Sequence, residues 1–270
     1  MLPGTASAGE AAASVAAKTV PYGVIDPTLL PIGYSGREVL HYDVSWTGGI
    51  KIGELHLEVN RLEGTADEFE IRATITTKNG AVDLIYPIKA LHVTKVRGPK
   101  RLPYHYEIWQ KEGYRYRAHR VLRYDQEGGE IVYMKNNKLE GVFKIDGETN
   151  NEFSSFFNSR LMDFPVGGGF IVPTFADKKR VEVMVNAISE QLIEETLLGA
   201  VRTVEIMPVM TFKGLYDKRG DTVIWYTNDE CRVPVLINSK IIIGSLTAEL
   251  TAYDNPACSR YPAVAKQQDN

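Results

Sequence analysis

The sequence predicts an all-β, mainly antiparallel protein: a β-barrel or curved half-barrel of about a dozen strands with one amphipathic helix. Segments in which apolar and polar residues alternate recur along the chain, as in strands with one packed and one solvated face. Turn-forming glycine, proline and asparagine residues separate these segments. Only one stretch has clear helical periodicity, which excludes a parallel α/β fold because such a fold alternates strands with helices.

The length of 270 residues accommodates one large β domain. We divide the chain into a leader (1–35), a single β-barrel-like domain (36–253) and a C-terminal tail (254–270). The 31 basic and 34 acidic residues nearly balance, so we expect no nucleic-acid partner. The sequence contains no run of eighteen apolar residues and therefore predicts no transmembrane segment.

The leader resembles the end of a secretory signal peptide. Ala6-Ser7-Ala8 has the small-x-small pattern that a signal peptidase requires, and the helix breaker Pro3 precedes it. The charged and apolar regions of a complete signal are missing, so an ordinary Ala-rich leader is the alternative. We expect a periplasmic or otherwise exported protein in which residues 9–35 are extended and weakly ordered.

Residues 36–59 predict the hairpin around which the domain is organised. Apolar and polar residues alternate over 40–47, and Gly48-Gly49 follows as a tight-turn signal. The apolar parity of the second arm changes at Gly53, which predicts a glycine bulge. Residues 50–55 are echoed by residues 241–246. If both copies bend strands at one level of the sheet, the first and last strands are neighbours and the barrel closes or nearly closes; a chance repeat is the alternative.

The remaining strands are expected at 69–76, 89–96, 103–110, 113–124, 130–135, 139–145, 181–185, 200–209, 222–227, 233–238 and 241–252. Residues 187–199 are compatible with a short helix, but the surrounding β signals favour a strand followed by a turn. The run Gly167-Gly168-Gly169 lacks the Gly-Lys-Ser/Thr of a phosphate loop. We interpret it as a connection through which the chain returns to the sheet.

The predicted helix follows residue 152. Its apolar residues form one stripe, at Phe153, Phe156, Phe157 and Leu161. Thr149 and Glu152 have the spacing of a capping box. The stripe is either a movable plug that covers a cavity in an open sheet or a permanent part of an ordinary core.

The two cysteines, Cys231 and Cys258, can form a disulfide in an oxidising compartment. Such a bridge closes a loop of about 27 residues and contributes roughly 3 kcal/mol. Two unpaired thiols are the alternative. The sequence has no CxxC motif, and its five histidines lack metal-ligand spacing, so we expect no cofactor and no metal.

Residues 89–123 have the most unusual composition, with ten basic and two acidic side chains. Arginines at strand spacing can hold a phosphate or carboxylate, and neighbouring aromatic rings suit a lipid headgroup or a glycan. The alternative is a solvated strand face whose arginine stems cover apolar surface. The candidate ligand-binding residues are Arg115, Arg117, Arg123, Tyr114, Tyr116, Trp109, Phe153, Phe156 and Phe157.

No motif identifies a reaction. A G-x-S-x-G elbow is missing, and Ser154-Ser155 lies in the predicted helix without a histidine nearby in the sequence. The carboxylate pairs Asp229-Glu230 and Glu194-Glu195 are better explained as hairpin tips than as acid–base pairs. We therefore expect no catalytic residues and a protein that is not an enzyme, with a hydrolase as the weakest alternative.

Several short motifs resemble those of a known protein family: Tyr42-Asp-Val-Ser-Trp46, Gly49-Ile-Lys-Ile-Gly53, Phe153-Ser-Ser-Phe-Phe157, Trp225 with Asp229-Glu-Cys-Arg-Val-Pro234, and Ile243-Gly-Ser-Leu-Thr-Ala-Glu-Leu250. With them the chain resembles the bacterial domain of unknown function 3108 family over about residues 36–253. The resemblance implies an exported, mainly β protein without known catalytic residues. A more distant, fold-level analogy is to the periplasmic lipoprotein carriers, whose curved sheets hold acyl chains.

Two functions of different classes follow. The first is a non-enzymatic periplasmic or cell-envelope protein that binds an amphipathic ligand, a lipid or lipid-linked glycan, inside the barrel or half-barrel. The second is an envelope assembly or scaffold protein that binds an envelope protein partner and has no ligand cavity. A filled interior together with an exposed strand edge favours the second function.

Overall fold

The computed structural model describes residues 20–78, 80, 87–176, 178–209, 222–241 and 244–266. Its helices are α1 (Leu30–Gly33) and α3 (Glu152–Ser159). The strands of the first half are β1 (Arg37–Trp46), β2 (Ile50–Arg61), β3 (Glu68–Thr77), β4 (Ile88–Arg97), β5 (Leu102–Glu112), β6 (Tyr116–Asp125), β7 (Glu130–Lys135) and β8 (Lys138–Lys144). Those of the second half are β9 (Gly169–Ala176), β10 (Lys179–Ile193), β11 (Val201–Val209), β12 (Thr222–Thr227), β13 (Pro234–Lys240), β14 (Ser245–Asp254) and β15 (Val264–Ala265).

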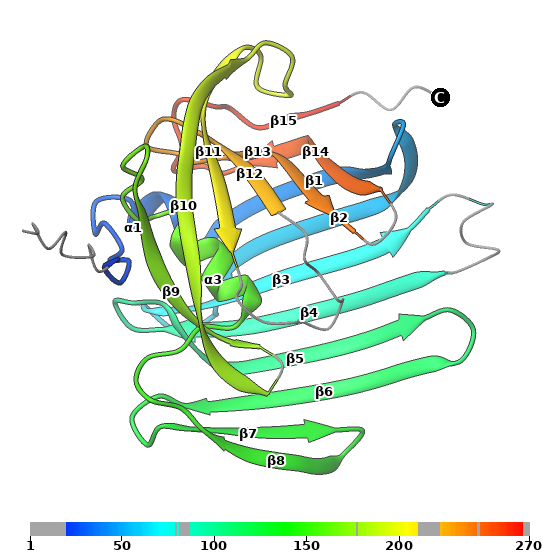
Figure 1. Ribbon diagram of the computed structural model, residues 1–270, viewed down its shortest axis with the longest axis vertical. Coiled ribbons are helices and arrows are strands. Elements are labelled where there is room, and N and C mark those ends of the chain that lie inside the picture. The colour runs from blue at the N-terminus through cyan, green and yellow to red at the C-terminus, as the bar shows by residue number, and fades with distance from the viewer. Residues whose placement is uncertain are drawn as a thin grey trace, which may run out of the picture.

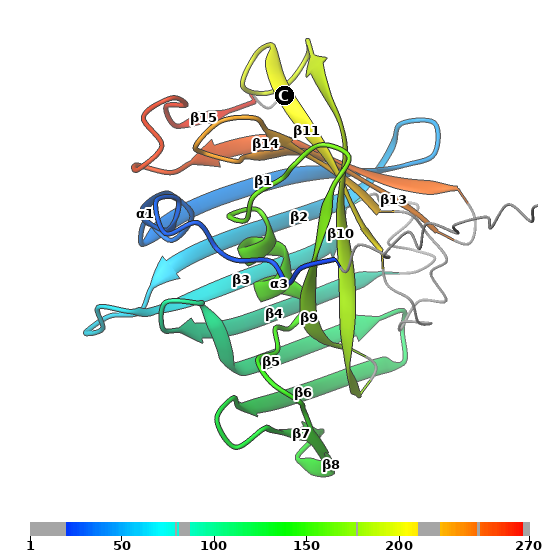
Figure 2. The ribbon, with the colours of Figure 1, turned by 60° about the vertical axis from the view of Figure 1, so that its left-hand side comes forward.

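All of these strands belong to one antiparallel sheet, in the order β8-β7-β6-β5-β4-β3-β2-β1-β14-β13-β12-β11-β10-β9, with β15 paired to β14. β1 to β8 form a broad wall, and β9 and β10 cross in front of it (Figure 1). Both ribbon views place α3 between this wall and β9 (Figure 2). The predicted curved, mainly antiparallel sheet with one amphipathic helix is confirmed.

The first hairpin forms as the sequence predicts. Gly48 and Gly49 have φ values of 86° and 80°, which glycine adopts without steric cost. Val44 pairs with Gly53 whereas Ser45 pairs with Lys51, so the expected one-residue slip is present. A Cβ atom on Gly53 would lie 2.2 Å from a backbone oxygen of β3, so glycine is required for close approach as well.

In the part of the chain that the structure describes, the sheet curls without closing through backbone pairs, since β8 and β9 end the strand order. β1 and β14, the first and last long strands, are neighbours as expected. The two similar segments themselves are not adjacent, because β2 and β14 pair with opposite edges of β1. Residues 242 and 243 of the second copy lie outside the described part of the chain.

Side chains connect the two ends of the sheet instead. The ring of Phe175 on β9 packs against Tyr124 of β6 and Phe143 of β8, with centroid distances of 6.3 and 5.7 Å. Lys178, which follows β9, forms a 3.0 Å ion pair with Glu140 of β8. The molecule is therefore a half-barrel whose ends meet through side-chain packing.

The N-terminal cap of α3 differs from the prediction. Asn151 accepts a 2.8 Å hydrogen bond from the Ser154 backbone N–H, and the Asn151 N–H donates to the Ser154 hydroxyl at 2.9 Å. Thr149 lies outside the helix, where its hydroxyl donates to the Gly147 carbonyl. The helix begins two residues later than Thr149 requires, because the asparagine side chain takes the capping position.

A buried ion pair fixes the other end of α3. Arg160, the residue after the helix, is fully buried, and its Nη2 donates to Glu38 Oε1 of β1 at 2.7 Å. The side chain of Asn255 donates to the same oxygen at 3.2 Å. Phe157 on the preceding turn is only 1% exposed. These contacts favour the interpretation of α3 as a permanent part of the core over the movable plug.

The leader is packed where the structure describes it. The Asp26 N–H donates to the Leu161 carbonyl at 2.9 Å, Tyr22 bridges to Ile171 of β9, and α1 follows. The expectation of extended, weakly ordered chain is therefore wrong for residues 20–35. The signal-like Ala6-Ser7-Ala8 lies outside the described residues.

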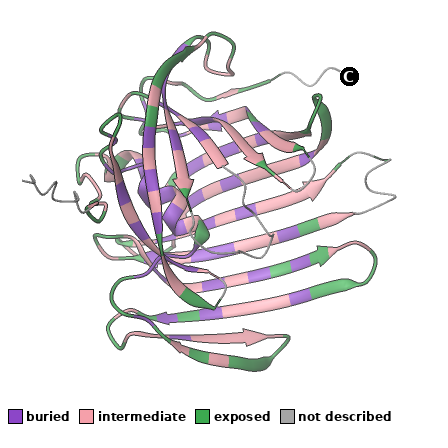
Figure 3. Cartoon of the chain, viewed as in Figure 1, coloured by how far each residue is buried: buried purple, intermediate pink, exposed green. Residues whose placement is uncertain are grey.

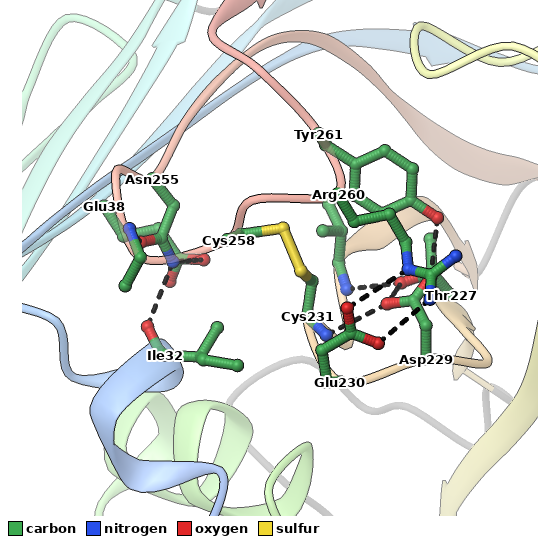
Figure 4. Close-up of a disulfide and its surroundings, with 12 residues drawn as sticks. Ile32, Glu38, Thr227, Asp229, Glu230, Cys231, Asn255, Cys258, Arg260 and Tyr261 are labelled. Atoms are coloured by element: carbon green, nitrogen blue, oxygen red, sulfur yellow. Dashed lines mark hydrogen bonds and ion pairs between the residues drawn. A yellow bond between two sulfur atoms is a disulfide. The ribbon is translucent and has the colours of Figure 1, made fainter.

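The tail is held by the predicted disulfide. Cys231 and Cys258 are bonded, with their Cα atoms 5.7 Å apart (Figure 4). Beside the bridge, the Tyr261 hydroxyl donates to Asp229, and Arg260 pairs with Glu230. The Asp229-Glu230 pair thus contributes to anchoring the tail at the tip after β12. No helix in the described ranges is long and apolar enough to span a membrane.

Candidate functional site

The strands β4, β5 and β6 have two different faces. We call the face toward α3 the inner face; the Phe153 ring of α3 lies 4.9 Å from the His92 ring there. The opposite face is the outer face. Buried and exposed residues alternate along these strands, as Figure 3 shows. Side chains of one parity therefore belong to each face.

The register places outer-face side chains in rows across the three strands. The first row is Lys89, Lys111 and Arg117. The second row is Leu91, Trp109 and His119. The third row is Val93, Glu107 and Val121, and the fourth is Lys95, His105 and Arg123.

An open groove of about 450 Å³ lies over the first two rows, and all six of their residues line it. Asn136, in the turn between β7 and β8, lines it as well. The Asn136 side-chain oxygen accepts a 2.9 Å hydrogen bond from the His119 backbone N–H, which fixes this turn against β6. The groove is therefore built from three consecutive strands of the wall, β4 to β6, and the turn between β7 and β8.

The first row carries positive charge that the described residues do not neutralise: none of their carboxylates pairs with Lys89, Lys111 or Arg117. The Arg117 Nη1 donates to the carbonyls of Tyr116 and Gly113, at 2.8 and 3.3 Å. These bonds hold the guanidinium near the end of its strand and leave its charge available. A row of this kind can bind an anion.

The carboxylate of Glu107, in the third row, interacts with two histidines. Its carboxylate lies 2.6 Å from His119 Nε2 and 3.3 Å from His105 Nε2. Partial burial raises the pKa of Glu107, but the hydrogen bonds from the histidines outweigh this and lower it overall. The carboxylate is thus held away from the cations of the first row.

The second row supplies an apolar floor. The rings of Trp109 and His119 are stacked, with centroids 5.3 Å apart and planes 17° apart. Trp109 is 41% exposed, and Leu91 of β4 is the residue opposite it. An indole face next to three cations can contact the apolar part of a molecule whose anionic group is held by the first row.

The predicted ligand-binding residues fall in separate places. Trp109 and Arg117 line the groove, and Arg123 lies on the same face two rows beyond the groove floor. Tyr114 and Arg115 are exposed in the turn before β6, because this strand begins at Tyr116 and not at residue 113.

The other predicted residues lie on the inner side of the sheet. Tyr116 accepts a hydrogen bond from Arg120 there. Phe153 contacts His92 and Tyr106, whereas Phe156 packs against Phe157 and Tyr226. The aromatic stripe and the groove cations are thus on opposite faces and cannot form one site. Four residues of the first two rows, Lys89, Leu91, Lys111 and His119, were not among the predicted ligand-binding residues.

Comparisons with known proteins are consistent with this architecture. The model of the family described as "Protein of unknown function (DUF3108)" matches residues 41–251. The crystal structure of a β-barrel-like protein of domain of unknown function DUF1849 from Brucella abortus has a TM-score of 0.54 at 11% identity, covering 81% of this chain and 97% of that one. A hypothetical protein from Chlamydia trachomatis has a TM-score of 0.36 at 9% identity, covering 86% and 93%. No curated protein matches the chain. The Brucella structure shows that the half-barrel fold is shared.

Proposed function

The chain belongs to the DUF3108 family, and from this premise we propose that it is a non-enzymatic cell-envelope protein that binds an amphipathic anion in the outer groove. The ligand class is the anionic headgroup of a lipid or of a lipid-linked glycan. The proposal differs from the expectation of a ligand inside the barrel beneath the aromatic stripe, because Phe157 and Leu161 of this stripe are packed in the core.

One observation carries the proposal: three cations lie directly opposite one another on adjacent strands, without carboxylate partners in the part of the chain that the structure describes. Like charges at directly opposed positions destabilise a sheet, on the order of 0.2–1 kcal/mol for each pair. A bound phosphate or carboxylate would relieve this repulsion. The arrangement is therefore better explained by a role in anion binding than by a contribution to the stability of the fold.

The position of the apolar floor supports an amphipathic ligand. Lys111 and Trp109 are two residues apart on β5 and so project from the same face. An anion bound between Lys111 and Arg117 would direct the adjoining part of the molecule over the indole. The guanidinium can offer two parallel N–H donors to a phosphate, and the lysines add charge without fixed geometry.

The disulfide supports an extracytoplasmic location. Disulfides persist in oxidising compartments, whereas cytosolic thiols are usually kept reduced. The bridge between Cys231 and Cys258 is fully formed and buried. An envelope protein would meet anionic lipid headgroups and lipid-linked glycans at the membrane surface.

Vesicle flotation tests the proposal. We expect the protein to bind vesicles of phosphatidylglycerol and not vesicles of phosphatidylcholine, with affinity that falls as salt rises. The double variant Lys111→Gln/Arg117→Gln should weaken binding at least about tenfold, since each lost charge-assisted contact costs about 1.5–3 kcal/mol.

Arg123→Gln is the matched control, because it removes a cation from the same face of the same strand outside the groove. It should bind like the parent protein. Competition by inorganic phosphate would identify the phosphoryl group as the recognised part; its absence would point to the whole headgroup. Equal binding of the double variant and the parent, or equal binding to both kinds of vesicle, would exclude the groove as the site.

A scaffold function is the second candidate, and the edge of β8, which has no further strand partner among the described residues, favours it. β8 ends the strand order, and Leu139 and Val142 on it are 61% and 49% exposed. A partner strand could pair with such an edge. In a deletion strain, loss of complementation with Val142→Lys but not with Lys111→Gln/Arg117→Gln would support the scaffold; the reverse would support the groove.

A further inference from the structure

The inner face of β4 to β6 carries a second group of polar side chains, outside the groove. His92 Nδ1 and the Tyr106 hydroxyl are 2.8 Å apart. The ring of Tyr106 lies 6.4 Å from that of Phe153 on α3, and Glu152, the first residue of α3, acts on the pKa of Tyr106. His92 and Tyr106 therefore lie at the N-terminal end of α3, beside Glu152.

Glu152 remains accessible even so. Its side chain is exposed, whereas its neighbours Asn151 and Ser154 are buried. Desolvation by the surrounding elements nevertheless raises the pKa of Glu152. The carboxylate thus lies on the inner side of the curved sheet, where it stays open to solvent and can accept hydrogen bonds.

Arg120 is the opposite charge on this face. Its Nη2 donates to the Tyr116 hydroxyl at 2.5 Å, and its side chain is partly exposed. Arg120 and His92 lie in one row of the inner face, with Ile108 of β5 between them. The charge of Arg120 acts on the pKa of both Glu152 and His92. The net charge of this group is near zero, in contrast to the first row of the groove.

Balanced charge determines which ligand suits the group. An anion would be repelled by Glu152, and a cation would be repelled by Arg120. A neutral molecule with several hydroxyl groups can accept from Arg120 and donate to Glu152 at once. Partly exposed aromatic rings, those of Phe153 and Tyr133, lie beside these groups and can contact the apolar face of a sugar ring.

The buried hydroxyl of Tyr124 is a further polar group of the inner face. The Tyr124 side chain is 5% exposed, and its hydroxyl has no hydrogen-bond partner among the described residues. It lies on the same face of β6 as Arg120 and interacts electrostatically with Glu152. Buried hydroxyls nearly always have a partner, so Tyr124 adds a donor to the inner face that the described residues do not use.

We propose that Glu152, Arg120 and His92, with the rings of Phe153 and Tyr133, form a second binding site, for the neutral sugar units of a glycan. This site is independent of the outer groove because residues of opposite parity on β4 and β6 build it. Loss of anion binding in the groove would therefore leave it intact.

Titration with the neutral trisaccharides maltotriose and N,N′,N″-triacetylchitotriose, followed by isothermal calorimetry and by NMR of the His92 ring, tests the site. We expect at least one of them to bind at millimolar concentration and to shift the His92 ring signals. Glu152→Gln preserves shape but replaces the charged acceptor, so affinity should fall about tenfold.

Glu148→Gln is the matched control. Glu148 is an exposed glutamate four residues earlier, paired with Lys100, and its substitution should leave sugar affinity unchanged. An unaltered melting temperature of both variants would exclude unfolding as the cause. Failure of both trisaccharides to bind, or equal affinity of Glu152→Gln and the parent, would overturn the proposal. Tighter binding of galacturonate than of either neutral sugar would overturn the assignment to neutral ligands.

Discussion

The two faces of β4, β5 and β6 carry different chemistry within one layer of backbone. The outer face places Lys89, Lys111 and Arg117 side by side, whereas the inner face sets Arg120 against Glu152. Arg117 and Arg120 are three residues apart on one strand and therefore project to opposite sides. A basic segment of sequence is thus divided by parity into a positively charged face and a charge-balanced face.

The largest expected effect comes from releasing the helix on which the inner face depends. Glu38→Ala would leave the buried guanidinium of Arg160 without its carboxylate. We expect the free energy of unfolding to fall by about 3–5 kcal/mol in urea denaturation. Glu58→Ala, on the outer face of β2, is the control and should change it by less than about 0.5 kcal/mol. A loss below about 1 kcal/mol for Glu38→Ala would show that α3 does not depend on the ion pair.

The second expected effect is a pH dependence that belongs to the inner face. Burial lowers the pKa of His92 from 6.5 to about 4. The folded protein binds this proton less readily than the unfolded chain. The contribution of neutral His92 to the free energy of unfolding is therefore complete above pH 6.5 and is lost as pH falls toward 4. Between pH 7 and pH 4.5 the parent should lose about 1–3 kcal/mol more stability than His92→Gln. An equal loss of stability in the parent and in His92→Gln over this pH range would contradict the lowered pKa of His92.

The smallest expected effect has opposite signs for stability and binding. Lys111→Glu places a carboxylate between Lys89 and Arg117, converting two repulsive cross-strand pairs into attractive ones. Stability should rise by about 1 kcal/mol in thermal unfolding, while binding to phosphatidylglycerol vesicles is lost. Lys95→Glu is the control: Lys95 lies opposite Glu70, so this change should lower stability slightly. A Lys111→Glu variant less stable than the parent would mean that repulsion among the three cations does not destabilise the sheet.

Local patterns were sufficient to predict much of the fold. The Gly48-Gly49 turn, the slip at Gly53 and the strands over 130–135 and 222–227 all depend on neighbouring residues, and each is confirmed. The disulfide is confirmed as well. The packed segment 20–35 was missed, because its prolines and irregular apolar spacing give no periodic signal even though Ile25 and Leu29 contact the core.

The candidate site was only partly predictable, for a physical reason. Trp109 and Arg117 were found from composition, since basic and aromatic residues gather around them. Lys89 and Lys111 are 22 residues apart and become partners only through the register of β4 with β5. In addition, side chains alternate between the two faces of the sheet only within a strand. Tyr114 and Arg115 belong to a turn and could not be assigned to a face by alternation.

The position of β1 between β2 and β14 has a consequence for how the chain acquires its structure. β1 to β8 can form successive hairpins as the chain emerges, because each strand pairs with the next one. One edge of β1 stays open until β14, more than 200 residues later, arrives. Such long-range pairing is slow, and an open strand edge promotes aggregation in the meantime. A chain that crosses a membrane in order from its N-terminus would need protection at this edge until its last long strand has been delivered.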